Sequence, residues 1–196
     1  MGLSRYPATM IRFLAVLALA VPFATASHAQ PRPEEPYVGQ PGKDVVWVPT
    51  PNDLVEKMLD MAQVTANDFV MDLGSGDGRN IIAAARRGAR GVGVEYDPNL
   101  VQVSRRNAAA AGVAHLARFV EDDMFEADIS KATVLALFLL PDNLTRLKPK
   151  FEKLRPGTRI VTNGYQIAGW EHTEMGVAGG ECAPWCHAYL YIVPAP

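Results

Sequence analysis

From about residue 52 onward, short apolar runs alternate with stretches in which apolar residues recur at helical spacing. Asp53 is a candidate N-cap for the first helical stretch. Strands that alternate with helices indicate an α/β fold, in which a doubly wound, mainly parallel sheet carries helices on both faces. The predicted helices cover 54–62, 79–87, 98–111 and a stretch from Asp142 that Pro149 interrupts, and the predicted strands cover 68–73, 91–95, 117–120, 133–140, 159–162 and 188–193.

The first 29 residues have the layout of a secretory signal. Two arginines are their only charges, an uncharged apolar run follows, and Ser27-His28-Ala29 supplies small residues for a cleavage site. The apolar run is short for a membrane span, which needs about 20 residues. We therefore expect residues 1–29 to be a signal peptide cleaved after Ala29, which implies an exported or periplasmic protein. The alternative is an uncleaved anchor in the inner membrane, with membrane association through residues 11–27.

The next segment, residues 30–51, is rich in proline, which predicts a linker or an extended arm. Residues 52–196 are then the folded domain, because a chain of 196 residues suits one domain with a substantial core. Its 48% apolar and 20% charged residues are typical of a globular protein. A net charge of −2 argues against nucleic acid as the main partner.

The two cysteines, Cys182 and Cys186, lie close together near the C-terminus. An exported location would permit a disulfide bond between them. Because His172, Glu181 and His187 lie nearby, a metal cluster can be imagined. The simpler interpretation is two small apolar residues or one local disulfide, and we expect no metal.

The stretch VMDLGSGDGRN, residues 70–80, carries the first chemical signal. It follows a predicted strand and precedes a helix, where three glycines allow a tight turn and close approach of the backbone to a ligand. Its third glycine comes one place earlier than in the dinucleotide pattern G-x-G-x-x-G. Asp72 and Asp77 would repel a pyrophosphate, which disfavours a nicotinamide-dependent oxidoreductase. They suit a cofactor that carries an ammonium and a sulfonium group instead, and S-adenosylmethionine carries both.

Acidic residues also end the next two predicted strands. Glu95 lies 19 residues after Gly76, where a carboxylate can accept hydrogen bonds from both ribose hydroxyls. Asp123 follows the third strand, where it could accept from the adenine amino group, and the adjacent Asp122 competes for this role. The glycine loop and the two acids are thus expected at three successive strand ends, the edge at which open α/β sheets bind ligands.

Four motifs, in order along residues 48–162, give the chain a resemblance to class I S-adenosylmethionine-dependent methyltransferases. They are VMDLGSGDG, GVGVEYDP, VEDDMF and ATVLALFLLP. The combination of DLGSGDGR, GVGVE and LFLLP, preceded by VPTP, is similar to one subgroup. This subgroup holds small bacterial methyltransferases and the mitochondrial protein-lysine methyltransferases that modify the c-subunit of ATP synthase and the adenine nucleotide translocase.

The resemblance implies a Rossmann-like class I methyltransferase fold and S-adenosylmethionine as the cofactor. Glu95 would bind the ribose, and Asp123 or Asp122 the adenine. Tyr96 would pack on the adenosine or be an ordinary half-buried aromatic residue, and Thr50 would reach the cofactor carboxylate from the arm. The methionine end would be held by the glycine loop and the acid before it, namely Asp72, Gly74, Ser75, Gly76 and Gly78.

Methyl transfer from a sulfonium needs alignment rather than a protein nucleophile, and the sequence indicates no catalytic residue. After the fourth strand the chain reads LLPD, residues 139–142, without the Asn/Asp-Pro-Pro-aromatic motif common in methyltransferases of nucleic-acid amines. The resemblance therefore favours a protein lysine as the methyl acceptor. The alternatives are a small-molecule acceptor, or an exported module that binds S-adenosylmethionine without catalysis.

Three further residues could serve the acceptor. Asp142 could help a lysine amine to lose its proton, or could be an ordinary helix N-cap. Tyr165 and Trp170 follow the fifth predicted strand and could line an acceptor channel, or could pack in the core.

Overall fold

A seven-stranded sheet lies at the centre of the part of the chain that the computed structural model describes, which is residues 1–2, 34–44, 46–179 and 186–195. The order of its strands is β3-β2-β1-β4-β5-β7-β6. Strands β1 to β5 are parallel, and β7 pairs antiparallel with both β5 and β6. The strands are β1 (Phe69–Leu73), β2 (Arg90–Glu95), β3 (Ala117–Glu121), β4 (Val134–Leu137), β5 (Arg159–Asn163), β6 (Glu174–Val177) and β7 (His187–Ile192).

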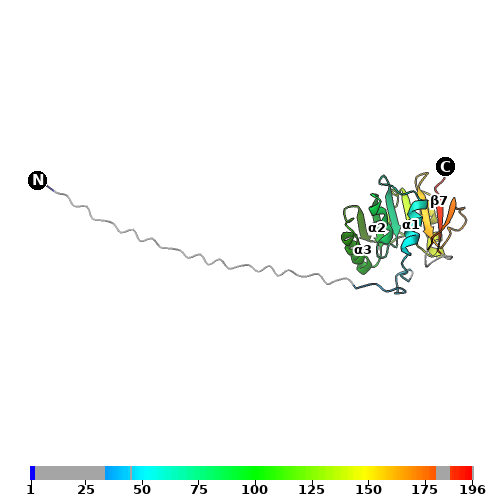
Figure 1. Ribbon diagram of the computed structural model, residues 1–196, viewed down its shortest axis with the longest axis horizontal. Helices are drawn as coiled ribbons and strands as arrows, with labels where there is room; N and C mark the ends of the chain where they lie inside the picture. Colours follow the sequence, from blue (N-terminus) through cyan, green and yellow to red (C-terminus); the bar gives the residue numbers. More distant parts are fainter. Residues whose placement is uncertain (3–33, 45, 180–185, 196) are drawn as a thin grey trace. The chain divides into compact units, whose positions relative to one another are not determined.

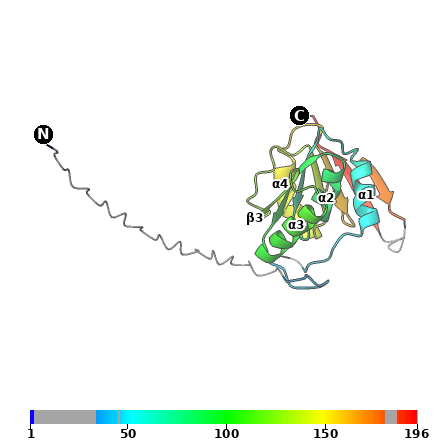
Figure 2. The ribbon, with the colours of Figure 1, turned by 60° about the vertical axis from the view of Figure 1, so that its left-hand side comes forward.

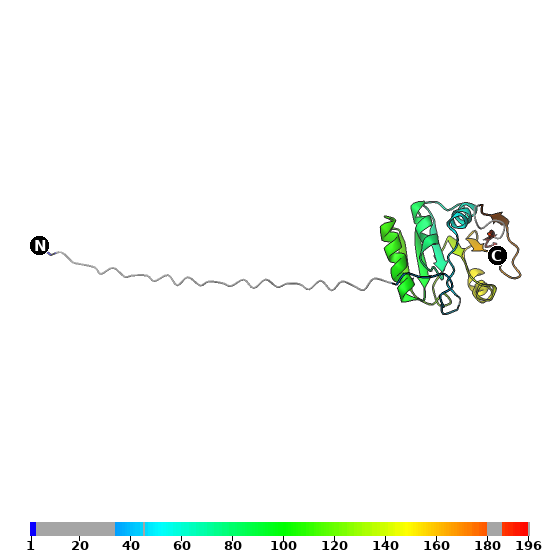
Figure 3. The same ribbon diagram turned by 60° about the horizontal axis from the view of Figure 1, so that its bottom comes forward.

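Helices cover both faces of this sheet, which confirms the doubly wound α/β fold. Helices α1 (Asn52–Met61), α2 (Arg79–Arg86) and α3 (Pro98–Ala110) lie on one face, and α4 (Pro141–Phe151) lies on the other (Figures 1 and 2). Figure 3 shows α1 in cyan and α4 in yellow on opposite sides of the strands.

The central strand β4 shows how the two helical layers hold the sheet. Val134 and Ala136 join the core cluster that contains the apolar residues of α1 and α2. Leu135 and Leu137 join the cluster that contains those of α4. Because successive side chains of a strand point to opposite faces, a strand between two helical layers must be apolar throughout. All four residues are fully buried, so the position of this strand and of its carboxyl end is well defined.

The fourth strand is shorter than the predicted 133–140. Its ladder ends at Leu137, and residues 138–140 leave the sheet. These residues are apolar because they line a pocket at the sheet edge, described below. Hydrophobicity alone therefore overestimated the length of this strand.

Strand β6 was not predicted from the sequence. Its four residues, EMGV, form the edge of the sheet and pair with β7. Helix α1 comes so close to this strand that a Cβ at Gly176 would lie 2.5 Å from Sδ of Met61. This close approach requires a glycine at position 176. Because glycine is uncommon inside strands, the sequence around it did not indicate a strand.

Two predictions about helix ends were wrong. Helix α1 begins at Asn52 with Pro51 at the N-cap position, so Asp53 lies in the first turn, where a negative charge is still favourable. Pro149 does not interrupt the fourth helix, because α4 continues to Phe151. In the last turn a proline costs one hydrogen bond, to the carbonyl four residues earlier, and the helix tolerates that loss.

Residues 34–50 form an arm that belongs to the same compact unit as the sheet, which covers residues 32–196. Figure 2 shows the arm in blue along the bottom of the domain, between α3 and α1. A short pairing stiffens it, because Gly39 N–H donates to the carbonyl of Trp47 (2.8 Å) and Trp47 N–H donates to that of Gln40 (2.9 Å). The segment predicted as a linker or arm is thus a docked arm.

The predicted signal peptide or anchor, residues 1–29, lies outside the described residues except for Met1 and Gly2. The cleavage after Ala29 and the membrane association through residues 11–27 therefore stay predictions. Within the described ranges, no helix has the length and apolar character that crossing a membrane requires.

Candidate functional site

The carboxyl edge of the parallel strands opens into a pocket of about 390 Å³. Strand β1 lies between β2 and β4, so the strand order reverses here, and open α/β sheets bind ligands at such points. The volume lies within the range of small-molecule sites. A recess of about 40 Å³ beside the glycine loop adjoins the pocket, and the two share Trp47, Val48, Gly74 and Phe138 as lining residues.

The glycine loop has a backbone that glycine adopts far more readily than other residues. Gly74, Gly76 and Gly78 have φ angles of 75°, 55° and 85°, all in the left-handed region. The N–H groups of Gly74 and Ser75 donate to the carbonyl of Val94 at 2.8 and 3.0 Å. These two bonds tie the loop to β2 and hold its backbone against the pocket.

Asp72, near the end of β1, is a buried acid with an incomplete set of partners. Its side chain is 3% exposed, and Oδ2 accepts a hydrogen bond from Nδ2 of Asn80 at 3.1 Å. Within the described part of the chain, Oδ1 has no partner. Burial raises the pKa of Asp72 well above its ordinary value; the Asn80 hydrogen bond opposes this shift, and the charges of Glu95 and Asp77 add to it. Such a group favours a cationic ligand, which would supply the missing donor.

Two more buried polar atoms close to Asp72 lack a partner among the described residues. They are Oγ of Ser75, in a residue 5% exposed, and Oδ1 of Asn80, in a residue 4% exposed. All three residues line the recess beside the glycine loop. An ammonium group would supply donors to Asp72 and Asn80. The donors and acceptors of this recess therefore fit the amino-acid end of S-adenosylmethionine.

Glu95, at the end of β2, is held in place by the backbone. Its Oε2 accepts from Gly76 N–H at 2.8 Å and its Oε1 accepts from Asp97 N–H at 3.0 Å. The carboxylate lines the pocket in this position. Because each oxygen has a further lone pair, the group can also accept from two ribose hydroxyls. The geometry fits the predicted ribose contact.

The two acids after β3 both line the pocket, but they have different partners. Asp122 is exposed and accepts from Asp123 N–H at 2.8 Å. Asp123 accepts from Phe125 N–H at 2.9 Å through Oδ1, and its Oδ2 pairs with Nζ of Lys43 at 2.5 Å. The Lys43 hydrogen bond lowers the pKa of Asp123. Asp123 therefore faces the pocket as a charged group and also caps a turn.

Tyr96 follows Glu95 and is 54% exposed. It lines the pocket, and Nζ of Lys43 lies 4.3 Å from the centre of its ring. The position agrees with the predicted packing on the adenosine.

Two residues of the glycine loop have roles other than those expected from the sequence. Asp77 forms an ion pair with Arg79, with Nη2 2.5 Å from Oδ2 and Nε 2.9 Å from Oδ1, so Arg79 offsets part of its charge. Exclusion of a pyrophosphate therefore rests more on Asp72 than on Asp77. Gly78 lines neither the pocket nor the recess, and a Cβ there would lie 2.6 Å from Cζ of Phe119. Close packing against β3 explains this glycine better than the predicted contact with the cofactor.

The end of the arm forms part of the recess. Thr50 lines it and is 4% exposed; its Oγ1 accepts from Nδ2 of Asn163 at 3.1 Å. Its carbonyl accepts from Nη1 of Arg79 at 2.5 Å. These contacts hold Thr50 where it could reach a cofactor carboxylate. Trp47 covers the loop itself, because a Cβ at Gly76 would lie 2.5 Å from Nε1 of the indole.

The candidate acceptor residues divide between pocket and core. Tyr165 lines the pocket and is 38% exposed. Trp170 packs on Tyr191, with ring centres 5.9 Å apart, and is a partly buried residue packed against the core cluster beneath α4. Asp142 is exposed in the first turn of α4, where Leu140 is the N-cap residue, so the N-cap interpretation was wrong.

The site also contains residues that were not predicted, among them Lys43, Trp47 and Asn80. Asn80 could have been found, because a polar residue directly after the glycine loop, on a helix otherwise rich in Ala and Ile, is unusual on a buried face. Lys43 and Trp47 lie in the proline-rich arm, which has no periodicity that would reveal which residues face the pocket.

The C-terminal cysteines and histidines give no metal site in the described part of the chain, where no three His, Cys, Asp or Glu residues cluster. Glu181 and Cys182 lie outside the described residues. Cys186 is disulfide-bonded, in a chain with two cysteines. His172 packs on the ring of Tyr189, with ring centres 5.3 Å apart.

Several curated relatives of this chain are lysine methyltransferases by name. A protein-lysine N-methyltransferase of Saccharolobus islandicus (strain REY15A) is 44% identical over 134 residues, which cover 67% of this chain and 83% of that protein. The ATP synthase C-subunit lysine N-methyltransferases of Xenopus laevis and Homo sapiens are 33% and 32% identical, over 63% and 80% of this chain. The chain spans only 55% and 62% of the length of these two vertebrate relatives.

Solved structures similar to this chain contain the product form of the cofactor. An RNA methyltransferase from Salinibacter ruber in complex with S-adenosyl-L-homocysteine has 46% identity and a TM-score of 0.71, and the match covers 76% of this chain and 95% of that one. A methyltransferase from Geobacter sulfurreducens with the same ligand has 25% identity and a TM-score of 0.51, and covers 58% and 48%.

The family match covers most of the site. Residues 72–174 match the family model described as the ANTKMT methyltransferase domain, from Asp72 in β1 to the first residue of β6. The ligands of the similar solved structures and the hydrogen-bond acceptors of the pocket and recess agree on S-adenosylmethionine as the cofactor. The chain belongs to the ANTKMT methyltransferase domain family and is an S-adenosylmethionine-dependent methyltransferase.

Proposed function

We propose that this enzyme transfers the methyl group to the side-chain amine of a lysine in a protein. The archaeal and vertebrate relatives are lysine N-methyltransferases by name, which supports this class of acceptor. The chemistry of the pocket supports it independently.

The observation that carries the proposal is the charge of the pocket wall. Among the described residues one base lines it, Lys43, and this base is already paired with Asp123. Acidic walls attract a cationic side chain and repel phosphate groups. A lysine is therefore a better match than a nucleic acid. The acids of the wall are Asp44, Glu95, Asp97, Asp122 and Asp123.

Apolar side chains at the mouth of the pocket suit the next step, in which the lysine amine must lose its proton before it attacks. Val46, Val48 and Leu140 line the pocket and are 57%, 44% and 43% exposed, and Tyr165 lies beside them. Apolar surroundings disfavour an ammonium and lower the pKa of a lysine. The acids would draw the side chain in, and the apolar wall would favour its neutral form.

The remaining work of the protein is alignment. S-adenosylmethionine, when bound, supplies a methyl group activated by the positive charge on its sulfur. Asp72 and the glycine loop would hold the methionine end, and Glu95 would hold the ribose. The arm would cover the pocket and exclude water, so that the amine and the methyl group meet in line.

Three alternatives remain as outcomes of the test. The Salinibacter ruber protein is described as an RNA methyltransferase, which makes RNA the first alternative acceptor. A small molecule is the second. The third is an exported module that binds the cofactor without catalysis, because S-adenosylmethionine is made in the cytosol.

Methyl transfer from labelled S-adenosylmethionine to whole-cell extract tests the proposal. We expect label in material that protease removes and ribonuclease does not, and methylated lysine after acid hydrolysis. The Asp72→Asn variant is the control for cofactor-dependent label. Label in RNA or in the low-mass fraction, or no transfer by a protein that binds S-adenosylhomocysteine, would contradict the lysine proposal.

We further propose that residues 1–29 direct the protein out of the cytosol. The support is the order of basic start, apolar run and small residues before Gln30. N-terminal sequencing of the mature protein from fractionated cells tests this. A start at Gln30 in the soluble exported fraction is expected. An intact Met1 in the membrane fraction would favour the anchor, and an intact Met1 in the cytosol would contradict both.

A further inference from the structure

Lys43 engages two residues predicted to contact the adenosine. Its Nζ donates to Oδ2 of Asp123 at 2.5 Å, and the same atom lies 4.3 Å from the ring centre of Tyr96. The side chains of Lys43 and Asp123 are 37% and 27% exposed, so the pair is open to solvent on one side. One ammonium group thus connects the acid and the aromatic ring of the same subsite.

Neither oxygen of Asp123 is left without a donor by these contacts. Oδ1 accepts from Phe125 N–H at 2.9 Å, and Oδ2 accepts from Lys43. An adenine amino group would need an acceptor at this wall of the pocket, and an adenine ring would need a face of Tyr96. Each oxygen of Asp123 keeps a further lone pair, so the competition is for space: the Lys43 ammonium lies against Oδ2 and over the ring of Tyr96, where the adenine would have to lie.

The rest of the arm is anchored without Lys43. Near its start, Glu34 N–H donates to Oδ1 of Asn99 at 2.8 Å, and Nδ2 of Asn99 donates to the carbonyl of Glu34 at 3.0 Å. Near its end, Thr50 is held by Arg79 and Asn163. Because both ends have their own contacts, the Lys43 side chain can leave Asp123 while the arm stays docked.

We propose that Lys43 is an internal competitor of the cofactor's adenine, a residue that lowers the affinity of the enzyme for S-adenosylmethionine and S-adenosylhomocysteine by occupying Asp123 and Tyr96. The competition affects the cofactor step alone. The proposal depends on the assignment of S-adenosylmethionine as the cofactor, and it does not depend on the identity of the methyl acceptor. Each turnover would then begin and end with an exchange at this subsite, which would speed the release of the product cofactor.

Calorimetric titration of the full chain with S-adenosylhomocysteine tests this proposal, because the titration needs no methyl acceptor. Lys43→Met keeps the apolar stem and removes the charge. An ion pair open to solvent and a cation–π contact are each worth a few-fold in an equilibrium constant, so we expect the dissociation constant to fall about three- to tenfold. Lys43→Gln should give the same direction.

The matched control is Lys153→Met, which removes an exposed lysine outside the pocket and should leave the affinity unchanged. Salt supplies a second measurement. Raising it from about 0.05 to about 0.5 M screens the exposed pair, so the wild-type affinity should approach that of Lys43→Met. An unchanged or weaker affinity in both Lys43 variants would overturn the proposal, because Lys43 would then be neutral or a ligand of the cofactor.

Discussion

Two buried aspartates lie at opposite ends of β1, Asp68 at the amino ends of the parallel strands (the amino edge) and Asp72 at their carboxyl ends (the carboxyl edge), and they have different sets of partners. Asp68 precedes β1, Asp72 comes four residues later near its far end, and both are at most 8% exposed. Asp68 accepts from Thr65 N–H and from Oγ1 of Thr133, each at 2.8 Å, and pairs with Arg159. Asp72 has one hydrogen bond, and within the described residues its second oxygen has none.

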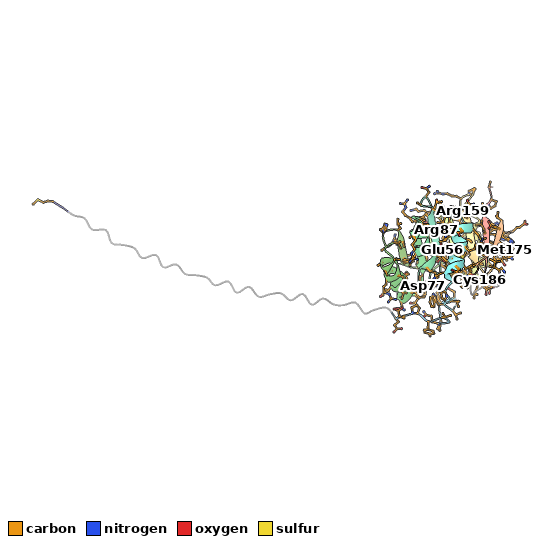
Figure 4. The ribbon with its side chains drawn as sticks, viewed as in Figure 1. Glu56, Asp77, Arg87, Arg159, Met175 and Cys186 are labelled. Carbon is orange, nitrogen blue, oxygen red and sulfur yellow. The ribbon has the colours of Figure 1, made fainter. Side chains whose placement is uncertain are left out.

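The pKa shifts of the two acids follow from these partners. Burial alone would raise both. For Asp68 the hydrogen bonds and the charge of Arg159 outweigh burial, and the pKa is lowered. For Asp72 burial dominates, and the pKa is raised well above its ordinary value. Figure 4 shows Asp77, in the loop after Asp72, and Arg159, the partner of Asp68, at opposite ends of the domain. The partners of Asp68 stabilise the fold, whereas Asp72, whose Oδ1 has no partner among the described residues, is a candidate for ligand binding.

The largest effect on stability is expected at the amino edge. Asp68→Asn leaves the guanidinium of Arg159 without its anion, and breaking a largely buried pair costs about 3 kcal/mol in the free energy of unfolding. Urea denaturation measures this loss. The affinity for S-adenosylhomocysteine should not change, so a weaker affinity in a folded Asp68→Asn protein would break the comparison.

The largest effect on the cofactor is expected at the carboxyl edge. Asp72→Asn removes the charge that would bind the ammonium group, and a hydrogen bond to a charged group is worth about 1.5–3 kcal/mol. The affinity for S-adenosylhomocysteine should therefore fall about ten- to a hundredfold. The free energy of unfolding should stay or rise, because the buried acid is costly. A loss of stability with full affinity would assign Asp72 to the structure instead.

The two aspartates should also give stability opposite pH dependences. The lowered pKa of Asp68 means that its contribution is present above the ordinary pKa of 3.8 and is lost as the pH falls through the folded value. The raised pKa of Asp72 means that stability is lost as the pH rises from 3.8 through the folded value.

Melting temperatures of the wild type and the two asparagine variants, measured across this range, test the signs. Other carboxylates cancel in each difference. Relative to the wild type, the melting temperature of Asp68→Asn should be lowered most at high pH. The melting temperature of Asp72→Asn should exceed that of the wild type by a margin that grows with pH. Affinity for S-adenosylhomocysteine should rise with pH through the raised pKa of Asp72. If the melting-temperature differences of both variants from the wild type changed with pH in the same direction, the opposite roles of the two aspartates would be contradicted.

The smallest effect on cofactor affinity is expected from an alanine at Gly76. Comparison with Gly112→Ala separates backbone strain at positive φ from the contact of the new Cβ with Trp47. Gly76→Ala and Gly112→Ala both place an alanine at positive φ, which should cost about 1 kcal/mol of stability at Gly112 and more at Gly76, where Trp47 must also move. A Cβ at Gly112 meets nothing within 4 Å, whereas one at Gly76 meets Trp47. Calorimetry should show a few-fold weaker cofactor binding for Gly76→Ala alone. Equal affinities would mean that Trp47 does not hold the loop.

The carboxyl edge could be predicted from the sequence where local pattern and chemistry coincide. A buried apolar strand, a glycine turn and an acid at the next strand end are local features, and they located Glu95 at the pocket, Asp72 at the adjoining recess and Gly74 at both. The amino edge was not predicted, because the partner of Asp68 is Arg159, 91 residues away. A pair so distant in sequence leaves no pattern in either neighbourhood.

The arm shows the same limit on the pocket side. Its proline content predicted a linker or an extended arm, and residues 46–51 form neither helix nor strand. Which side chains it presents to the pocket depends on tertiary contacts, and so Lys43 and Trp47 were not predicted. Gly78 shows the converse, since its place in the motif suggested a ligand while Phe119 explains it by packing.

A crystal structure of the protein with S-adenosylhomocysteine tests the central claim most directly. The account predicts the amino group of the ligand within hydrogen-bond distance of Oδ1 of Asp72, the ribose hydroxyls on Glu95, and the adenine beside Tyr96 with Lys43 withdrawn from Asp123. A ligand bound elsewhere, or one bound here with Oδ1 of Asp72 still unpaired, would contradict it.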